Sequence, residues 1–267
     1  MRIARAALHF WEEPCITGKT GSGAVFFSGC QLKCVYCQNR SIAYGGVGKE
    51  ITVERLCEIF FELKEKGAGN INLVTCDHFY PDVAKSIERV KKEGFGLPFV
   101  LNTSGYVSEE EIEKFDGLID IYLSDFKYFS PFLAKKYSHA PDYPGVVKKA
   151  TDKMFSLIKG AVINEKGMME RGLIVRHLVL PTHADDSKKI ISYLYNRYSD
   201  DIYISIMNQF TPTVNCKAFP ELMRKVSEEE YAGVIDFALS LGIKNAFVQE
   251  EGTCDESFIP AFDYEGV

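Results

Sequence analysis

The sequence lacks any apolar run that approaches the ~18 residues needed to span a bilayer. Its opening, MRIARAALHFWEEP, places two arginines before a short apolar stretch, but Glu12 and Glu13 end that stretch early. No small-residue cleavage site follows, as a signal peptide would require. We therefore expect no signal peptide, no membrane partner and a cytoplasmic location.

The chain also lacks an excess of positive charge. Its 31 lysines and arginines face 37 aspartates and glutamates, which gives a formal net charge of -6. Proteins that bind nucleic acids through phosphate groups normally carry the opposite balance. We therefore expect no nucleic-acid partner, although a small local basic pocket is compatible with this charge.

The cysteine content is too low for a small scaffold held by disulfides. The chain has eight cysteines among 267 residues, and without an export signal we expect reduced thiols. Five of them are scattered. Cys30, Cys34 and Cys37 instead lie together in GCQLKCVYCQNR, at the spacing C-x3-C-x2-C. The spacing of these three cysteines indicates a metal site or a catalytic function.

Short apolar runs alternate with amphipathic segments along the chain. The expected strands span residues 24–28, 70–75, 98–103, 118–124, 173–180, 201–207 and 246–250. Helical apolar spacing follows most of them, and Ser108 and Ser227 each precede a glutamate at capping-box spacing. Strands that alternate with helices indicate a parallel sheet with helices outside it. No Gly-rich phosphate fingerprint follows the first strand, so we predict an α/β fold, a partial (β/α)6 barrel of the TIM type.

This barrel should occupy residues 24–250, between an N-terminal extension over 1–23 and a C-terminal tail over 251–267. Phe10, Trp11 and Pro14 are apolar, and the open end of a barrel needs shielding from solvent. We therefore expect the extension to pack on the barrel and to cover its mouth.

Polar residues gather where the expected strands end, which is where such barrels carry their chemistry. The cysteine loop follows the first strand. The polar residues after the later strands are Asp77, His78, Asn102, Thr103, Asp125, Lys127, Asn208 and Gln209. This agreement predicts an active site at the carboxyl edge of the sheet.

Three interpretations of the cysteine loop compete. A structural zinc site needs four protein ligands, so a distant residue such as Cys76 or His78 would have to complete it. A redox pair would use only two of the three cysteines. An iron–sulfur cluster held by three thiolates keeps one iron open for another ligand. Gly29 and Tyr36 beside the triad, and its place directly after a strand, favour the cluster, with zinc as the main alternative.

The motif C-x3-C-x-aromatic-C after the first strand of a partial barrel resembles the radical S-adenosylmethionine (SAM) enzymes. Over roughly residues 20–210, the stretches SGCQLKCVYCQN, TSGY, SDFK and RHLVLP resemble the branch that contains pyruvate formate-lyase activating enzymes. The opening HFWEEPCITG resembles an uncharacterised subgroup of that branch.

The resemblance implies a [4Fe-4S] cluster on Cys30, Cys34 and Cys37, with SAM bound to the open iron. One electron from the cluster would split SAM into methionine and a 5′-deoxyadenosyl radical, which removes a hydrogen from the substrate. The chain would then be a radical SAM oxidoreductase with an electron donor such as flavodoxin or ferredoxin. Its substrate would be the glycyl-radical loop of a partner protein. The alternatives are modification of a small molecule or another peptide, and a non-catalytic metal-binding protein.

The resemblance also assigns contacts to SAM. Tyr36 would pack near the adenine, while Lys127 would offset the methionine carboxylate with Asp125 beside it. Further matches to the family are Asn102, Thr103 and Arg176.

Two positions depart from the family pattern. Related activating enzymes carry Gly-Gly-Glu after the second strand, where this chain has LVTCDHF, so Thr75, Asp77 or His78 would have to hold the amino group of SAM. A histidine expected after the sixth strand is replaced by NQF, with Asn208 or Gln209 as its substitute.

Overall fold

The computed structural model describes residues 1–249 and 260–267, and seven parallel strands form the centre of its sheet. In spatial order they are β2 (Ser22–Phe27), β4 (Ile71–Val74), β5 (Phe99–Thr103), β6 (Ile121–Asp125), β8 (Met169–Leu178), β9 (Tyr203–Met207) and β10 (Ala246–Val248). The predicted α/β partial barrel with parallel strands is therefore confirmed, and the last expected strand is shorter than predicted.

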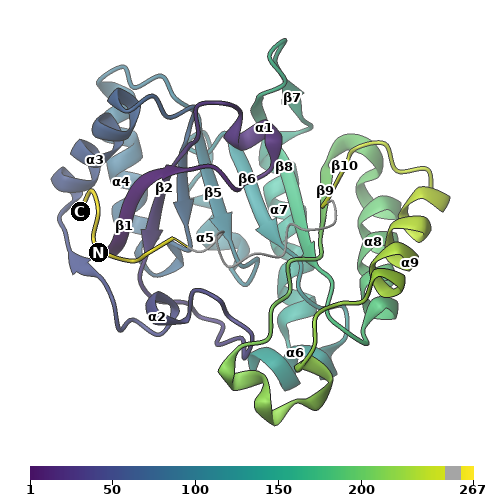
Figure 1. The fold of residues 1–267 in the computed structure, drawn as a ribbon. Helices are drawn as coiled ribbons and strands as arrows, with labels where there is room; N and C mark the ends of the chain where they lie inside the picture. Colours follow the sequence, from purple (N-terminus) through teal and green to yellow (C-terminus); the bar gives the residue numbers. More distant parts are fainter. Residues whose placement is uncertain (250–259) are drawn as a thin grey trace.

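Helices cover the outside of this sheet, as Figure 1 shows. The longer ones are α3 (Val53–Glu65), α4 (Tyr80–Lys92), α5 (Glu109–Glu113), α6 (Pro131–Ser138), α7 (Tyr143–Ile158), α8 (Ala184–Tyr198) and α9 (Glu228–Ser240). Both predicted capping boxes, at Ser108 and Ser227, are present. Among the described residues, every helix is too short or too polar to cross a membrane.

An antiparallel strand, β1 (Arg2–His9), extends the sheet beyond β2, and β3 (Lys49–Glu50) pairs with its outer edge. Residues 260–267 lie against β1, where Ala6 N donates to Glu265 O at 2.8 Å and Tyr264 N donates to Ala4 O at 3.1 Å. The two termini therefore lie close together (Figure 1). Residues 251–259 of the expected C-terminal tail lie outside the described residues.

The segment between β1 and β2 closes the end of the barrel opposite to the predicted one. Its short helix α1 (Pro14–Thr17) buries Cys15 and Ile16 against inward-facing apolar side chains of β5, β6 and β8. Asn70, at the start of β4, donates from Nδ2 to Ile16 O at 2.7 Å, which places α1 at the amino-terminal ends of the strands. The expectation that the extension covers the barrel mouth is wrong, because Cys15 and Ile16 close the interior from the other side, while the side chains of Phe10 and Trp11 are about half exposed.

Two further short elements lie next to the ends of parallel strands. The helix α2 (Arg40–Ala43) follows the cysteine loop, and β7 (Val162–Ile163) pairs antiparallel with β8. Because β2, β4, β5 and β6 pair in parallel, the loop after β2 and the residues after β5 and β6 share one carboxyl edge of the sheet, as predicted.

Candidate active site

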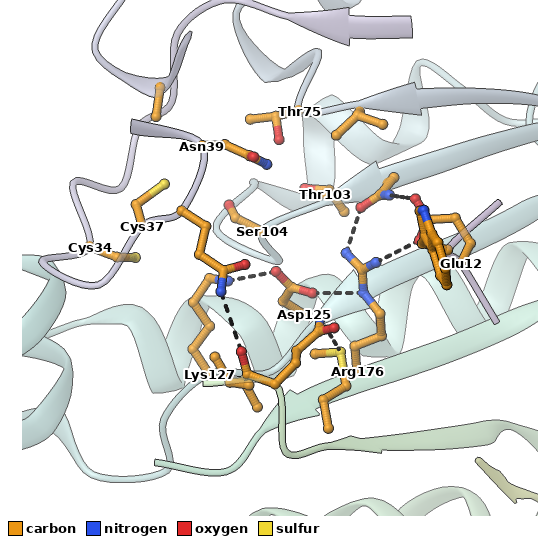
Figure 2. A pocket seen from close by; sticks show the side chains of 18 of the residues that line it. Glu12, Cys34, Cys37, Asn39, Thr75, Thr103, Ser104, Asp125, Lys127 and Arg176 are labelled. Carbon is orange, nitrogen blue, oxygen red and sulfur yellow. Dashed lines mark hydrogen bonds and ion pairs between the residues drawn. The ribbon is translucent and has the colours of Figure 1, made fainter. Parts of the chain in front are cut away.

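A cavity of about 360 Å³ reaches from the cysteine loop to the segment before α1. Its wall includes the candidate residues of the sequence analysis except Asp77, His78 and Asn208. Figure 2 shows Cys34 and Cys37 on one side and Glu12 on the other, with Asp125, Lys127 and Arg176 between them. The predicted gathering of polar residues at one edge therefore corresponds to one cavity.

The backbone at Gly29 lets the cysteine loop leave β2 sharply. Its φ is +106°, and a Cβ built there would lie 2.6 Å from Cδ2 of His78, so only glycine fits without displacement. Further along the loop, Cys37 N donates to Cys34 O at 3.1 Å, and Val35 N donates to Tyr137 O at 2.8 Å. The first bond tightens the loop itself, and the second holds it against α6.

The thiols of Cys30, Cys34 and Cys37 are free and line the cavity together. Burial, with the neighbouring Cys34 as the next cause, raises the pKa of Cys30 to about 12 and that of Cys37 to about 11. Thiolates at such sites need a strongly positive ligand beside them. Cys76, which a zinc site would have used, is fully buried and does not line the cavity.

Among the described residues, no three or more His, Cys, Asp or Glu side chains lie close enough together to hold a single metal ion. In a [4Fe-4S] cluster, by contrast, each thiolate binds a different iron, so the sulfur atoms need not converge on one point. Three thiols without a fourth protein donor therefore fit a cluster that keeps one iron open.

Asp125 and Lys127 form an ion pair in the middle of the cavity wall. Lys127 Nζ lies 2.6 Å from Asp125 Oδ2, and Arg176 Nε lies 3.0 Å from Asp125 Oδ1. Burial alone would raise the pKa of Asp125, but the two cations hold it below its usual value. Asp125 in turn keeps the pKa of Lys127 raised despite burial. Both groups are therefore charged at neutral pH.

Arg176 is held on all sides by groups of the protein. Besides Asp125, its Nη1 lies 3.1 Å from Glu12 Oε2, and its Nη2 donates to Asn102 Oδ1 at 2.6 Å. Arg176 lines the cavity, so its expected contact with SAM stays a prediction, and its hydrogen bonds fix Asp125, Asn102 and Glu12 in the wall.

Glu12 and Glu13 are site residues that the sequence analysis missed. Glu12 Oε1 accepts from Asn72 Nδ2 at 2.9 Å, and Glu13 is 8% exposed, with an Oε2 that has no hydrogen-bond partner among the described residues. Burial raises the pKa of both carboxyl groups. The available signal was Arg176, because a cation inside an apolar strand must find an anionic partner.

The region that replaces Gly-Gly-Glu contains one polar residue that lines the cavity, Thr75. Its φ of +55° is unusual for a β-branched residue, and its N donates to Asn102 O at 2.8 Å. Asp77 instead is buried outside the cavity wall, where its Oδ1 accepts from Tyr80 Oη at 2.8 Å and from Thr103 Oγ1 at 3.1 Å. The expectation that Asp77 contacts SAM is therefore corrected. The turn at Thr75 directs the side chain of Asp77 away from the cavity, toward Tyr80 and Thr103.

Tyr36 and Gln209 lie on the wall near the cysteine loop. The ring of Tyr36 packs edge-on against Phe210, with centroids 5.9 Å apart, and Gln209 Oε1 accepts from Gln249 Nε2 at 3.2 Å. His177, in contrast, is a structural residue: its ring bonds to Phe126 O and to Ser187 Oγ, both at 2.8 Å. Burial lowers the pKa of His177 to about 4.

The parallel partial barrel and its thiol-lined cavity define a class of cofactor-dependent enzymes. Residues 24–169, more than half of the chain, match the model of the Radical SAM superfamily. The chain therefore belongs to the radical SAM superfamily, and its cofactors are a [4Fe-4S] cluster and SAM.

Two curated proteins are similar in sequence. The chain is 26% identical over 239 residues to an uncharacterized protein of Methanocaldococcus jannaschii, covering 86% of this chain and 65% of that protein. It is also 26% identical over 172 residues to the pyruvate formate-lyase-activating enzyme of Clostridium pasteurianum, covering 62% of this chain. The chain thus spans 65% of the length of each relative.

Two solved structures share the fold. Streptococcus suis SuiB bound to the precursor peptide SuiA has a TM-score of 0.55 at 9% identity, covering 84% of this chain and 47% of that one. The FeFe-hydrogenase maturase HydG from Carboxydothermus hydrogenoformans has a TM-score of 0.53 at 12% identity, covering 89% and 60%. At such identities, the likeness is one of fold alone.

Proposed function

We propose that this enzyme couples the reductive cleavage of SAM to the removal of a hydrogen atom from a glycyl residue of a partner protein. The observation that carries the catalytic part is the meeting of three free thiols and the ion pair of Lys127 with Asp125 in one cavity. The similarity to the pyruvate formate-lyase-activating enzyme supports the choice of substrate.

Cys30, Cys34 and Cys37 are the residues that would hold the cluster. When bound and reduced, the cluster supplies one electron that splits SAM into methionine and a 5′-deoxyadenosyl radical. Lys127 would face the carboxylate of SAM, because a buried cation attracts that group through a charge-assisted hydrogen bond. Asp125 keeps Lys127 protonated and fixes its position.

The remaining wall residues would orient SAM and exclude water. Asn102 and Thr103 end β5 beside Thr75, whose turn lies where related enzymes hold the amino group. Tyr36 and Phe210 provide an apolar face suited to the adenine. A shielded site protects a reactive radical from side reactions with solvent. The electron would come from a small redox protein such as flavodoxin or ferredoxin.

A second candidate substrate is a small molecule with an amino group. The buried carboxyl group of Glu13 favours it, because a cation would supply the partner that its Oε2 lacks among the described residues. This candidate changes only the substrate. In either case, the hydrogen atom passes to the 5′-deoxyadenosyl group, and 5′-deoxyadenosine leaves.

Deuterium transfer distinguishes the two substrates. The source organism is grown in heavy water, its lysate is separated anaerobically into proteins and small molecules, and each fraction is given to the reduced, cluster-loaded enzyme with SAM. Deuterated 5′-deoxyadenosine from the protein fraction, together with a glycyl-radical signal in electron paramagnetic resonance (EPR), supports the activase. Deuterium from the small-molecule fraction supports the second candidate.

The control in both arms is Cys34→Ser, which should form no deuterated product. If the wild-type enzyme forms 5′-deoxyadenosine without deuterium from either fraction, neither substrate proposal holds.

A further inference from the structure

Three buried hydroxyl groups connect in series to the thiol of Cys34. Ser138 Oγ lies 2.9 Å from Cys34 Sγ, Tyr128 Oη lies 2.7 Å from Ser138 Oγ, and Tyr36 Oη lies 2.6 Å from Tyr128 Oη. All four side chains are more than nine-tenths buried. The series joins the cysteine loop, the segment after β6 and the last residue of α6.

A thiolate at Cys34 fixes the direction of every bond in this series. The sulfur then carries no hydrogen, so Ser138 must donate to it. A hydroxyl group has one hydrogen, so Ser138 Oγ must accept from Tyr128, and Tyr128 Oη must in turn accept from Tyr36. All three O–H groups therefore point toward the sulfur, and bonds aligned in this way strengthen one another in a buried setting.

The series is not needed to hold the loop in place. Val35 N donates to Tyr137 O at 2.8 Å, and Thr213 Oγ1 donates to Val35 O at 2.7 Å, so the backbone beside Cys34 is already anchored on two sides. Within the described residues, Cys30 and Cys37 have no comparable side-chain donor. The hydroxyl groups thus act on one sulfur of the three.

We propose that Ser138, Tyr128 and Tyr36 form a hydrogen-bonded chain that raises the reduction potential of the cluster through Cys34. The proposal rests on the role of Cys34 as a cluster ligand. A cluster that gains one electron places more negative charge on its sulfur ligands, and donors to those sulfurs stabilise that charge. The three residues are positioning residues: they ease the entry of the electron and do not touch the reacting atoms through these bonds.

The test is a redox titration of the reconstituted cluster without SAM, followed by EPR and visible absorption. At the wild-type midpoint potential, Ser138→Ala should lower the ratio of reduced to oxidised cluster about three- to tenfold, equivalent to about 28–59 mV for one electron. Tyr128→Phe should shift the midpoint in the same direction by less, because Ser138 still donates. Ser138→Thr, which keeps the hydroxyl group, should restore the wild-type value.

Ser86→Ala is the matched control. Ser86 is also a buried helical serine, but its Oγ donates to Asp82 O at 2.9 Å on α4. Its removal should leave the potential unchanged. Unchanged potentials in both Ser138→Ala and Tyr128→Phe would overturn the proposal, as would equal shifts in Ser86→Ala. If Ser138→Ala loads no cluster, Tyr128→Phe decides the question by the same criterion.

Because the titration needs neither SAM nor substrate, it is independent of the proposed reaction. An unshifted potential in a variant that still forms 5′-deoxyadenosine rejects the hydroxyl chain and leaves the proposed function intact. If the variants shift the potential but the enzyme accepts hydrogen from neither lysate fraction, the hydroxyl chain is supported and the proposed function is rejected.

Discussion

The ion pair between Arg176 and Glu12 should hold the N-terminal segment inside the barrel. The side chains of Arg176 and Glu12 are only 15% and 9% exposed. Removing one partner of such a buried pair costs about 3–5 kcal/mol. Arg176→Met leaves Glu12 and Asp125 without their shared cation, so we expect it to lower the free energy of unfolding by about 3–5 kcal/mol. Glu12→Gln should cost about 1.5–3 kcal/mol, because Arg176 keeps its bond to Asp125.

The assay is a double-mutant cycle in urea, with circular dichroism as a probe of the whole fold. The single tryptophan, Trp11, directly precedes Glu12 and provides a fluorescence probe of the segment itself. The double variant should lose less stability than the sum of the single variants, with a coupling energy of about 1–3 kcal/mol. Arg89→Met is the control: its pair with Glu54 is exposed and should contribute at most about 1 kcal/mol.

If the effects of the two single changes add within about 0.5 kcal/mol, the pair of Arg176 and Glu12 does not hold the segment. An Arg176→Met variant that is no less stable than Arg89→Met would lead to the same conclusion.

Three further predictions concern single residues. Lys127→Met should weaken the binding of SAM to the cluster-loaded protein at least about tenfold, measured by calorimetry; unchanged affinity would exclude the carboxylate contact. The stability of the wild type should fall by up to about 1.4 kcal/mol per pH unit between pH 6.5 and pH 4, because the unfolded chain protonates His177 near 6.5 and the folded chain only near 4. His177→Asn should flatten this dependence in urea unfolding, and an equal slope would contradict the assignment. Gly29→Ala should reduce the iron bound per chain because its Cβ meets His78, whereas Gly94→Ala, with open space around its Cβ, should not.

Much of the fold could be predicted because each parallel strand is a local apolar run between turn signals. The strand β1 could not, because its sequence, RIARAALH, contains few β-branched or aromatic residues. It forms a strand by pairing with β2, at a register that joins Ala6 to Val25. That pairing depends on tertiary contacts, as does the closing of the barrel from its amino-terminal end. Local sequence patterns therefore could not predict either feature.

In the site, too, local motifs could be predicted and contacts between distant residues could not. The cysteine triad is local in the sequence, so its spacing indicated its chemistry directly. Glu12 and Arg176 lie 164 residues apart, and the sequence pointed to only one member of the pair. Asp77 was assigned by its position after a strand, but the positive φ of Thr75 turns the chain so that Asp77 meets Tyr80. Ser138 belongs to no motif, and only the packing of α6 brings it to Cys34.

In this enzyme, we expect the three thiols to hold a cluster that cleaves SAM. The most direct measurement is anaerobic reconstitution with iron and sulfide, followed by reduction with dithionite, addition of SAM and quantification of 5′-deoxyadenosine. We expect about four irons per chain with matching sulfide, and 5′-deoxyadenosine formed in step with methionine. A variant in which Cys30, Cys34 and Cys37 are all alanine should bind no cluster and form neither product. A wild-type protein that binds zinc in place of iron would show that the three thiols do not hold this cluster, and one that loads the cluster and never yields 5′-deoxyadenosine would show that it does not cleave SAM.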